Sequence, residues 1–219
     1  LPHIKVTYAD VWEFWQKNPE IAPSVDFVTI HILPYWENDP ASIDQAINHV
    51  AYVRETIVQE FPGKDIFIGE TGWPSFGRQR EGAKPSLVNQ ARFIREFTQL
   101  AHTKNWHYNI IEAFDQPWKR AGEGGVGGYW GLWDTQRQAK ASLGNSVSNF
   151  PEWKFWALVS FGLVLIFSPL ISFQIKDIKK FLLEVLILSG SSFLVTLQMH
   201  DYLLLARDDL EMIQNALVI

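Results

Sequence analysis

A glutamate in this 219-residue chain has the surroundings of an enzyme nucleophile. Glu70 follows the apolar run Asp65-Ile66-Phe67-Ile68, which is typical of a buried strand, and lies in the segment Gly69-Glu70-Thr71-Gly72-Trp73-Pro74-Ser75. A carboxylate at a strand end is held by the backbone and faces a cleft, and the indole of Trp73 offers an apolar face on which sugars stack. The pattern predicts a nucleophile that attacks the anomeric carbon of a sugar.

Alternating strand and helix patterns supply the elements that would position Glu70. Apolar runs predict strands at residues 4–8, 26–32, 66–68 and 108–114. Helices are predicted over 9–15, from about Ser42 to a stop at Pro62-Gly63, and after Pro85-Ser86. Repeated βα units with apolar strands predict an α/β fold with a parallel sheet covered by helices, in which chemistry belongs at the carboxyl ends of the strands.

Composition narrows the classes of function. The chain is 47% hydrophobic and 20% charged, so it can bury a core. A net charge of -5 with scattered basic residues predicts no nucleic-acid partner. The sequence contains no cysteine, which excludes disulfides, thiolate metal sites and a cysteine nucleophile. No His, Asp and Glu cluster has metal-ligand spacing, so we expect neither a metal nor another cofactor.

Two apolar stretches near the carboxyl terminus predict membrane-spanning helices. Residues 155–173 contain no charged residue and would span about 28 Å as a helix, close to the ~30 Å hydrocarbon thickness of a bilayer. Residues 181–199 carry only Glu184, near the start, where a charge reaches the interface. A buried helical hairpin of a soluble domain is the alternative.

Charge in the connector predicts the orientation in the lipid bilayer. The segment 174–180 carries three lysines and one aspartate, which favours the cytoplasmic side. We therefore expect a glycosidase portion at 1–150 on the non-cytoplasmic side, periplasmic or extracellular, and two transmembrane helices over 151–200. Residues 201–219 either extend the second span or begin another helix.

Three motifs in order resemble glycoside hydrolase family 17, the β-1,3-glucanases and glucanosyltransferases. They are the Glu70 segment, Pro34-Tyr35-Trp36 upstream, and Phe114-Asp115-Gln116-Pro117-Trp118-Lys119 downstream. A Gly-Tyr-Trp-Gly-Leu segment at 128–132 is similar to a loop of bacterial, membrane-anchored members. The resemblance covers residues 1 to about 135 and implies the fifth to eighth strands of a (β/α)₈ barrel, a retaining mechanism, and Glu70 as the nucleophile.

The resemblance also implies a partner for Glu70 that this sequence lacks. Retaining hydrolysis uses a second carboxyl group as acid/base, and the family carries it in an Asn-Glu motif, which occurs nowhere in this chain. We expect a fragment without the amino-terminal half of the barrel, inactive alone, from an enzyme that hydrolyses β-1,3-glucan or transfers its glucosyl units. The alternative is a non-catalytic, membrane-anchored glycan-binding or scaffold module.

Candidate substrate-binding residues lie at the strand ends. Aromatic side chains there predict sugar stacking, with packing at the barrel top as the alternative, and the remaining candidates come from the resemblance. His31 is as well explained as a core histidine, Glu37 is expected to be a solvated loop carboxylate, and Glu112 faces either the barrel interior or the helices. The candidates are Tyr35, Trp36, Trp73, Asp115, Gln116, Trp118, Lys119 and His31.

Overall fold

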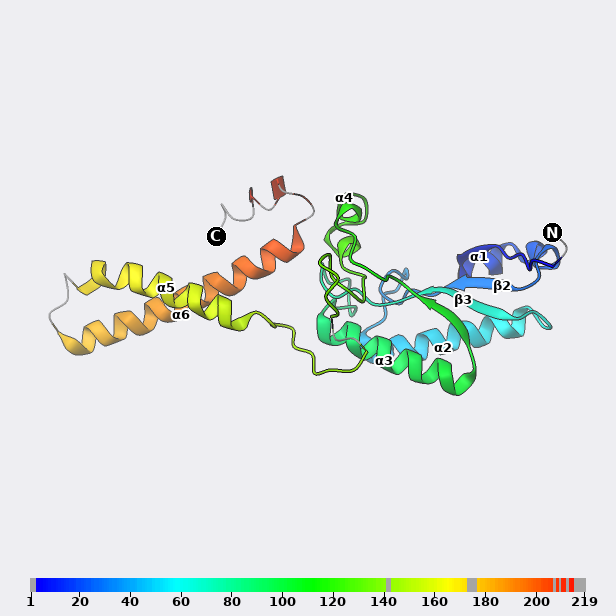
Figure 1. The fold of residues 1–219 in the computed structure, drawn as a ribbon, viewed down its shortest axis with the longest axis horizontal. Coiled ribbons are helices and arrows are strands. Elements are labelled where there is room, and N and C mark those ends of the chain that lie inside the picture. The colour runs from blue at the N-terminus through cyan, green and yellow to red at the C-terminus, as the bar shows by residue number, and fades with distance from the viewer. Residues whose placement is uncertain are drawn as a thin grey trace. The chain divides into compact units, whose positions relative to one another are not determined.

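The structure is a computed structural model that describes residues 3–140, 143–172, 177–206, 208, 210–211 and 213–214. The chain forms two compact units, Leu1–Asn149 and Phe150–Ile219. In Figure 1 the first unit runs from blue to green and the second from yellow-green to red. The first carries the candidate chemistry, and the second contains the two apolar stretches.

A parallel sheet forms the centre of the first unit. Its strands are β1 (Ala9–Val11), β2 (Val28–His31), β3 (Ile66–Thr71) and β4 (His107–Ile110), paired in the order β1-β2-β3-β4. Every pair is parallel, and each connection crosses over through at least one helix. This arrangement confirms the predicted α/β class and brings the carboxyl ends of the strands to one edge.

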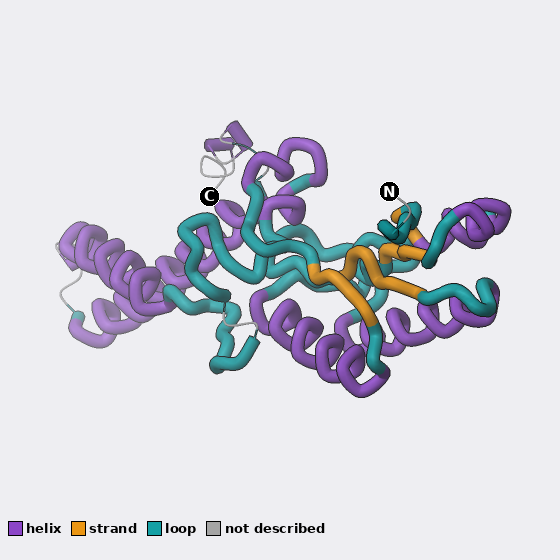
Figure 2. Tube along the Cα trace, turned by 45° about the vertical axis from the view of Figure 1, so that its right-hand side comes forward, coloured by secondary structure: helices purple, strands orange, loops and turns teal. Residues whose placement is uncertain are grey.

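Helices α2 (Ile43–Glu60) and α3 (Leu87–Lys104) lie side by side along one face of the sheet (Figures 1 and 2). Shorter elements complete the first unit: α1 (Trp12–Lys17), α4 (Arg120–Glu123), and 3-10 helices at Pro19–Ser24, Pro117–Lys119 and Gly125–Gly128. The apolar periodicity of α2 and α3 places one stripe of each helix on the strands.

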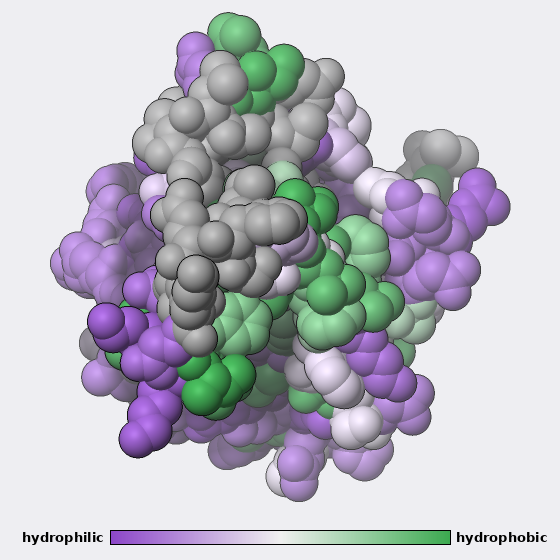
Figure 3. All heavy atoms as spheres, turned by 90° about the vertical axis from the view of Figure 1, so that its left-hand side faces the viewer, coloured by the Kyte–Doolittle hydropathy of each residue, from purple (hydrophilic) through white to green (hydrophobic). Residues whose placement is uncertain are grey.

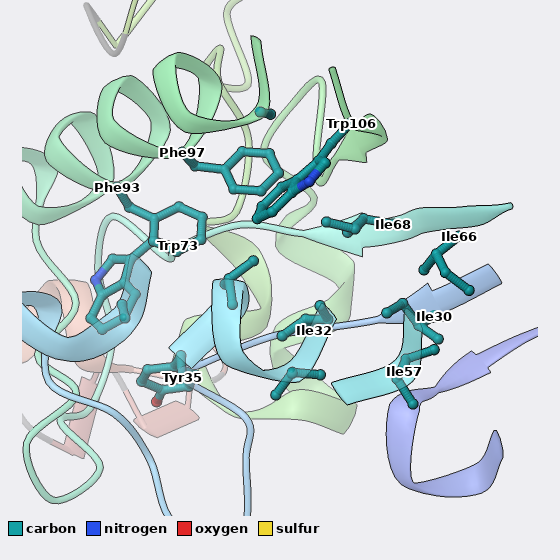
Figure 4. Packing of buried hydrophobic residues seen from close by; sticks show 14 of the residues in the cluster. Ile30, Ile32, Tyr35, Ile57, Ile66, Ile68, Trp73, Phe93, Phe97 and Trp106 are labelled. Carbon is teal, nitrogen blue, oxygen red and sulfur yellow. The ribbon is translucent and has the colours of Figure 1, made fainter. Parts of the chain in front are cut away.

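Aromatic and β-branched side chains fill the layer between the helices and the sheet. Phe93 and Phe97 extend from α3 and stack with ring centroids 5.9 Å apart, and Ile68 of β3 belongs to the same buried cluster (Figure 4). Phe93, Phe97 and Ile68 are fully buried. Burying a side chain of this size contributes about 1.5–3 kcal/mol, so this layer fixes the strand carrying Glu70.

The first and last strands differ most from the sequence prediction. The first strand is Ala9–Val11, not 4–8, because the amide of Val6 donates to the Asp26 carboxylate, where a strand neighbour would offer a backbone carbonyl. The last strand ends at Ile110, and after the Ile111 amide, which still donates to the Thr71 carbonyl of β3, the backbone bonds to other partners. Glu112 N–H donates to the Trp130 carbonyl, and Leu132 N–H donates to the Glu112 carbonyl.

The second unit consists of α5 (Trp153–Ser172) and α6 (Ile178–Leu205). The Ser192 hydroxyl, from α6, donates to the Ser160 carbonyl of α5 at 2.9 Å. Large apolar side chains on both helices are exposed, including Leu158 and Leu186 at 70% and 69%. Hydrophobic spheres also lie on the surface of the face drawn in Figure 3.

One of the two predicted spans has the length and composition of a transmembrane helix. Among the described residues, Ile178–Tyr202 alone meets both criteria, and Trp153–Pro169 is a shorter apolar helix. The helix α6 runs past the predicted end at 199, to Leu205. The expected end of the first span at Phe173, connector residues 174–176 and, in the tail, residues 207, 209, 212 and 215–219 lie outside the described residues.

Candidate active site

Glu70 lies in β3 at the carboxyl edge of the sheet, with His31 of β2 next to it. The strand register pairs these two residues, and the Glu70 carbonyl accepts a hydrogen bond from the Ile32 amide at 2.9 Å. The His31 Nδ1 atom lies 3.4 Å from Glu70 Oε2. The Glu70 side chain remains 42% exposed, so its carboxylate is held on one side and open to solvent on the other.

Glycines flank Glu70-Thr71 because neighbouring groups approach the backbone closely. A Cβ atom at Gly69 would lie 2.5 Å from Thr29 Cγ2, and one at Gly72 would lie 2.5 Å from the Ile111 carbonyl oxygen. No side chain fits at such distances without a shift of the neighbour, and at Gly72 that neighbour is backbone. The two glycines therefore seat the Glu70 segment tightly between β2 and the end of β4.

The expected sugar-stacking roles of Trp73 and Tyr35 are wrong. Trp73 is fully buried next to Phe93 (Figure 4), and its indole N–H donates to the Lys84 carbonyl at 3.1 Å. Tyr35 is 1% exposed, and its hydroxyl donates to the Arg78 carbonyl at 2.7 Å. Burial raises the pKa of Tyr35, against an opposing effect of nearby Arg80. Both rings pack below the surface because their polar tips find backbone acceptors there.

Trp36 and Trp118 keep exposed faces. Trp36 is 38% exposed and stacks on Trp130 with ring centroids 6.4 Å apart. The Arg80 guanidinium lies 5.3 Å from the Trp36 ring centroid. Trp118 is 73% exposed, and its indole N–H donates to the Gln116 side-chain oxygen at 3.1 Å. These two indoles are available to a ligand.

Glu112 is a second carboxylate at this edge, held by two neighbours. Its side chain is 12% exposed and forms an ion pair with Lys119. The Gln116 amide donates to Glu112 Oε2 at 2.6 Å. Two predicted substrate-binding residues, Gln116 and Lys119, are therefore engaged with a carboxylate of the same loop.

Asp115 does not face a ligand, which corrects its expected substrate-binding role. Its side chain is 6% exposed, and its Oδ1 atom lies 2.5 Å from Lys140 Nζ and accepts the Gly131 amide at 2.9 Å. Burial raises the pKa of Asp115, and the attraction of Lys140 opposes that rise only in part. The side chain is enclosed because the 129–140 segment folds over it, a long-range contact that the local motif does not reveal.

Glu37 is not the solvated loop carboxylate that the sequence suggested. Its side chain is 9% exposed. The Trp12 indole N–H donates to both carboxylate oxygens, at 3.1 and 3.3 Å, and His49 Nε2 lies 3.2 Å from Oε1 in an ion-pair contact. Trp12 thus serves a polar role. The position of Trp12 directly after β1, at the carboxyl end of a strand, is the sequence feature that could have indicated this role.

A cavity of about 370 Å³ opens beside this carboxylate. Its volume is within the range of small-ligand pockets. It shares His31 with the Glu70 pair and includes the partly exposed indole of Trp36. Within the described residues, no group of three or more His, Asp or Glu is arranged to hold a metal. The cavity is lined by Asp10, Val11, Trp12, Glu13, Phe14, Lys17, His31, Leu33, Trp36, Glu37 and Asn38.

A solvent-facing glutamate at the carboxyl edge of a parallel βα sheet, beside a cavity and exposed indoles, fits the class of glycoside hydrolases. The sequence profile of the BtgE/BtgC glycoside hydrolase domain matches residues 2–131. The chain belongs to this family.

Curated relatives agree with this assignment. The chain is 34% identical over 132 residues to a probable beta-glucosidase btgE of Aspergillus fumigatus, covering 60% of this chain and 23% of that protein. It is 29% identical over 140 residues to a glucan 1,3-beta-glucosidase of Saccharomyces cerevisiae, covering 58% and 42%. The chain therefore spans between about a quarter and less than half of the length of these relatives.

Solved structures of family 17 share the fold. A β-1,3-glucanosyltransferase of Rhizomucor miehei is 31% identical with a TM-score of 0.57, covering 64% of this chain and 50% of that one. An active-site mutant of the Rhizomucor miehei β-1,3-glucanosyltransferase, in complex with laminaritriose, is 27% identical with a TM-score of 0.58, covering 68% and 52%. These findings confirm the predicted resemblance to family 17.

Proposed function

We propose that this chain supplies the nucleophile of a retaining glycoside hydrolase acting on β-1,3-glucan, and that Glu70 is that nucleophile. The proposal rests on the solvent exposure of the carboxylate side chains. The Glu70 side chain is 42% exposed, whereas those of Glu37, Glu112 and Asp115 are 9%, 12% and 6% exposed and engaged with cations or donors. Of these carboxylates, Glu70 is the one that an incoming sugar can reach.

In this mechanism a Glu70 oxygen attacks the anomeric carbon, and the bond from that carbon to the leaving oxygen breaks. A second carboxyl group protonates the leaving oxygen and then activates water or an acceptor sugar, which releases the glucosyl unit. His31 lies next to Oε2, so we assign the attack to Oε1 and give His31 the role of orienting the carboxylate.

The acid/base must lie about 5–5.5 Å from Glu70 in a retaining enzyme. We propose that it comes from further βα units that complete a (β/α)₈ barrel on the amino-terminal side. Two observations support this proposal. The first is that this chain covers only 52% and 50% of the two matched Rhizomucor chains, so each of them is about twice as long as the part that aligns. The second concerns the sheet. Within the described residues, β1 and β4 are the outer strands of the sheet.

The glucan is proposed to lie across the carboxyl edge of the sheet. The 370 Å³ cavity and Trp36 would hold one part of the chain, and the exposed indole of Trp118 another. The matched glucanosyltransferase in complex with laminaritriose supports this substrate class. Tyr35 and Trp73 support the site from below, because both are buried.

We further propose that the second unit anchors the enzyme in a lipid bilayer, as in a membrane-anchored, bacterial-type member. The exposed apolar surfaces of α5 and α6 and the length of Ile178–Tyr202 support this. The lysine-rich connector would be cytoplasmic, which puts the glycosidase portion on the periplasmic or extracellular side.

A substitution tests the assignment of Glu70. In the full-length protein, Glu70→Gln should abolish release of sugar from laminarin, because an amide is not a competent nucleophile, while Glu55→Gln on the exposed side of α2 should leave it unchanged. Retained activity of the Glu70 variant would refute the assignment.

A glycan-binding module is the second candidate, favoured by the lack of an Asn-Glu acid/base motif in the sequence. It predicts laminarin binding by the full-length protein with no turnover. Product analysis with acceptor oligosaccharides separates hydrolysis, transfer and plain binding in one experiment.

A further inference from the structure

A buried ion pair lies behind the Glu70 segment. The Lys140 Nζ atom lies 2.5 Å from Asp115 Oδ1 and 2.9 Å from Ser75 Oγ. The side chains of Lys140 and Asp115 are each 6% exposed. Ser75 is the last residue of the Glu70 segment and is itself fully buried.

This cluster joins three segments at the carboxyl edge of the sheet. The Ser75 amide and hydroxyl both donate to the Tyr129 carbonyl, at 2.9 and 3.0 Å. The Asp115 carboxylate also accepts the Gly131 amide at 2.9 Å. Because Lys140 donates to Ser75 Oγ, the Ser75 hydroxyl proton is left to point at Tyr129, and each member of the cluster fixes the next.

The Ser75 end of the segment is connected to Glu70 by a chain of fixed residues. Thr71 is fully buried, Gly72 has no room for a side chain next to the Ile111 carbonyl, and Trp73 is fully buried. A movement at Ser75 therefore passes to the strand end, since the residues between have no free space in which to absorb it.

We propose that Lys140 is a positioning residue that sets the orientation of Glu70 through Ser75. The proposal rests on the nucleophile role proposed for Glu70. Lys140 lies beyond the residues 2–131 that match the family profile.

Stability alone does not explain a charge pair in this place. Burial lowers the pKa of Lys140 and raises the pKa of Asp115, so for both groups the loss of solvation outweighs their mutual attraction. Buried ion pairs often stabilise no more than apolar residues of the same volume, while breaking one side is costly. What the pair supplies is a fixed geometry for the three segments it joins.

The test is the rate at which an activated fluorosugar traps Glu70 in the full-length protein. In 2,4-dinitrophenyl 2-deoxy-2-fluoro-β-laminaribioside, attack by the Glu70 oxygen forms the C1–O bond as dinitrophenolate leaves with the bonding electrons. That leaving group needs no proton, so an acid/base is not required. Lys140→Met should lower the maximal trapping rate at least tenfold with unchanged affinity for the reagent, and Lys140→Arg should restore most of it.

A matched control separates positioning from general loss of structure. Lys64 is also a partly buried lysine, donating to the Val25 carbonyl at 2.5 Å at the other end of the strands. Lys64→Met should leave the trapping rate unchanged. If Lys140→Met does not fold, the double variant Asp115→Leu/Lys140→Met removes both charges, and it should trap the reagent as slowly as predicted for the single variant.

The outcomes separate the two proposals. No trapping in the wild-type protein refutes the proposed function of Glu70. If the wild type is trapped and Lys140→Met, or the folded double variant, is trapped at the same rate, the positioning role of Lys140 is overturned and the role of Glu70 stands. A trapping rate that falls as much in Lys64→Met as in Lys140→Met would also overturn the positioning role of Lys140.

Discussion

At the residue scale, the carboxylates near the candidate site differ more in solvent exposure than in residue type. Glu70, Glu112 and Asp115 all lie near the carboxyl edge of the same sheet, but Glu70 alone of these three has a side chain more than a third exposed. Sequence patterning located Glu70 because a strand end and flanking glycines are local signals. It could not show which acidic side chains become covered, because that depends on the distant 129–140 segment.

His31 gives a first prediction. His31→Ala removes the group next to Glu70 Oε2, so the carboxylate loses its orientation, and kcat on laminarin should fall about tenfold with little change in KM. The matched change is His49→Ala, at a histidine of helix α2 whose ring contacts Glu37 and not Glu70. A kcat that survives the first change would show that His31 is a packing residue.

Trp118 and Trp73 give a second prediction, in which one substitution affects substrate binding and the other affects stability. Trp118 is 73% exposed, so Trp118→Ala should raise KM for laminarin while leaving thermal unfolding unchanged, because the ring contributes to binding only. Trp73 is fully buried, so Trp73→Ala should destabilise the protein by about 3–5 kcal/mol. Calorimetry and steady-state kinetics on both variants provide the comparison, and equal loss of stability in both would contradict it.

At the element scale, the helices were easier to predict than the strands. Apolar periodicity and the Pro-Gly stop predicted α2 and α3, both of which the structure contains. The first and last strands were misplaced because a strand ends where its hydrogen-bond partners end. Those partners, Asp26 for Val6 and Trp130 for Glu112, are far away in the sequence.

The buried pair gives a third prediction at this scale. Burial lowers the pKa of Lys140 below its ordinary value of 10.5, so the folded protein releases this proton at a lower pH than the unfolded chain. Between the lowered pKa and 10.5 the unfolded chain binds more protons, so the contribution of Lys140 to stability rises with pH. The free energy of unfolding of the wild type minus that of Lys140→Met should therefore increase as the pH rises toward 10.5.

Chemical denaturation of both proteins across that pH window measures the difference. A pH-independent difference would show that Lys140 keeps its ordinary pKa, and a decrease would show that the attraction of Asp115 outweighs the loss of solvation.

At the scale of the whole molecule, the sequence predicted the α/β class and two apolar helices, but not the cavity. The cavity forms from the end of β1, from α1 and from the loop after β2, segments that only the folded sheet brings together. Family membership follows from residues 2–131. The second unit lies outside that match, so its role rests on its own apolar surface.

The proposed topology gives a fourth prediction. The sequence contains no cysteine, so single cysteines can be introduced without background. With a membrane-impermeant maleimide, Asn145→Cys should react in intact cells, and Lys179→Cys only after permeabilisation, because the first precedes the proposed spans and the second lies in the connector. Equal labelling of both before permeabilisation would refute the membrane anchor.

The most direct test of the central claim is to identify the residue that carries the trapped sugar. After reaction of the full-length protein with the dinitrophenyl fluorosugar, proteolysis and mass spectrometry should find one glycosyl ester, on Glu70. An ester on Glu37, Glu112 or Asp115, or no ester under conditions where the protein turns over laminarin, would contradict Glu70 as the nucleophile.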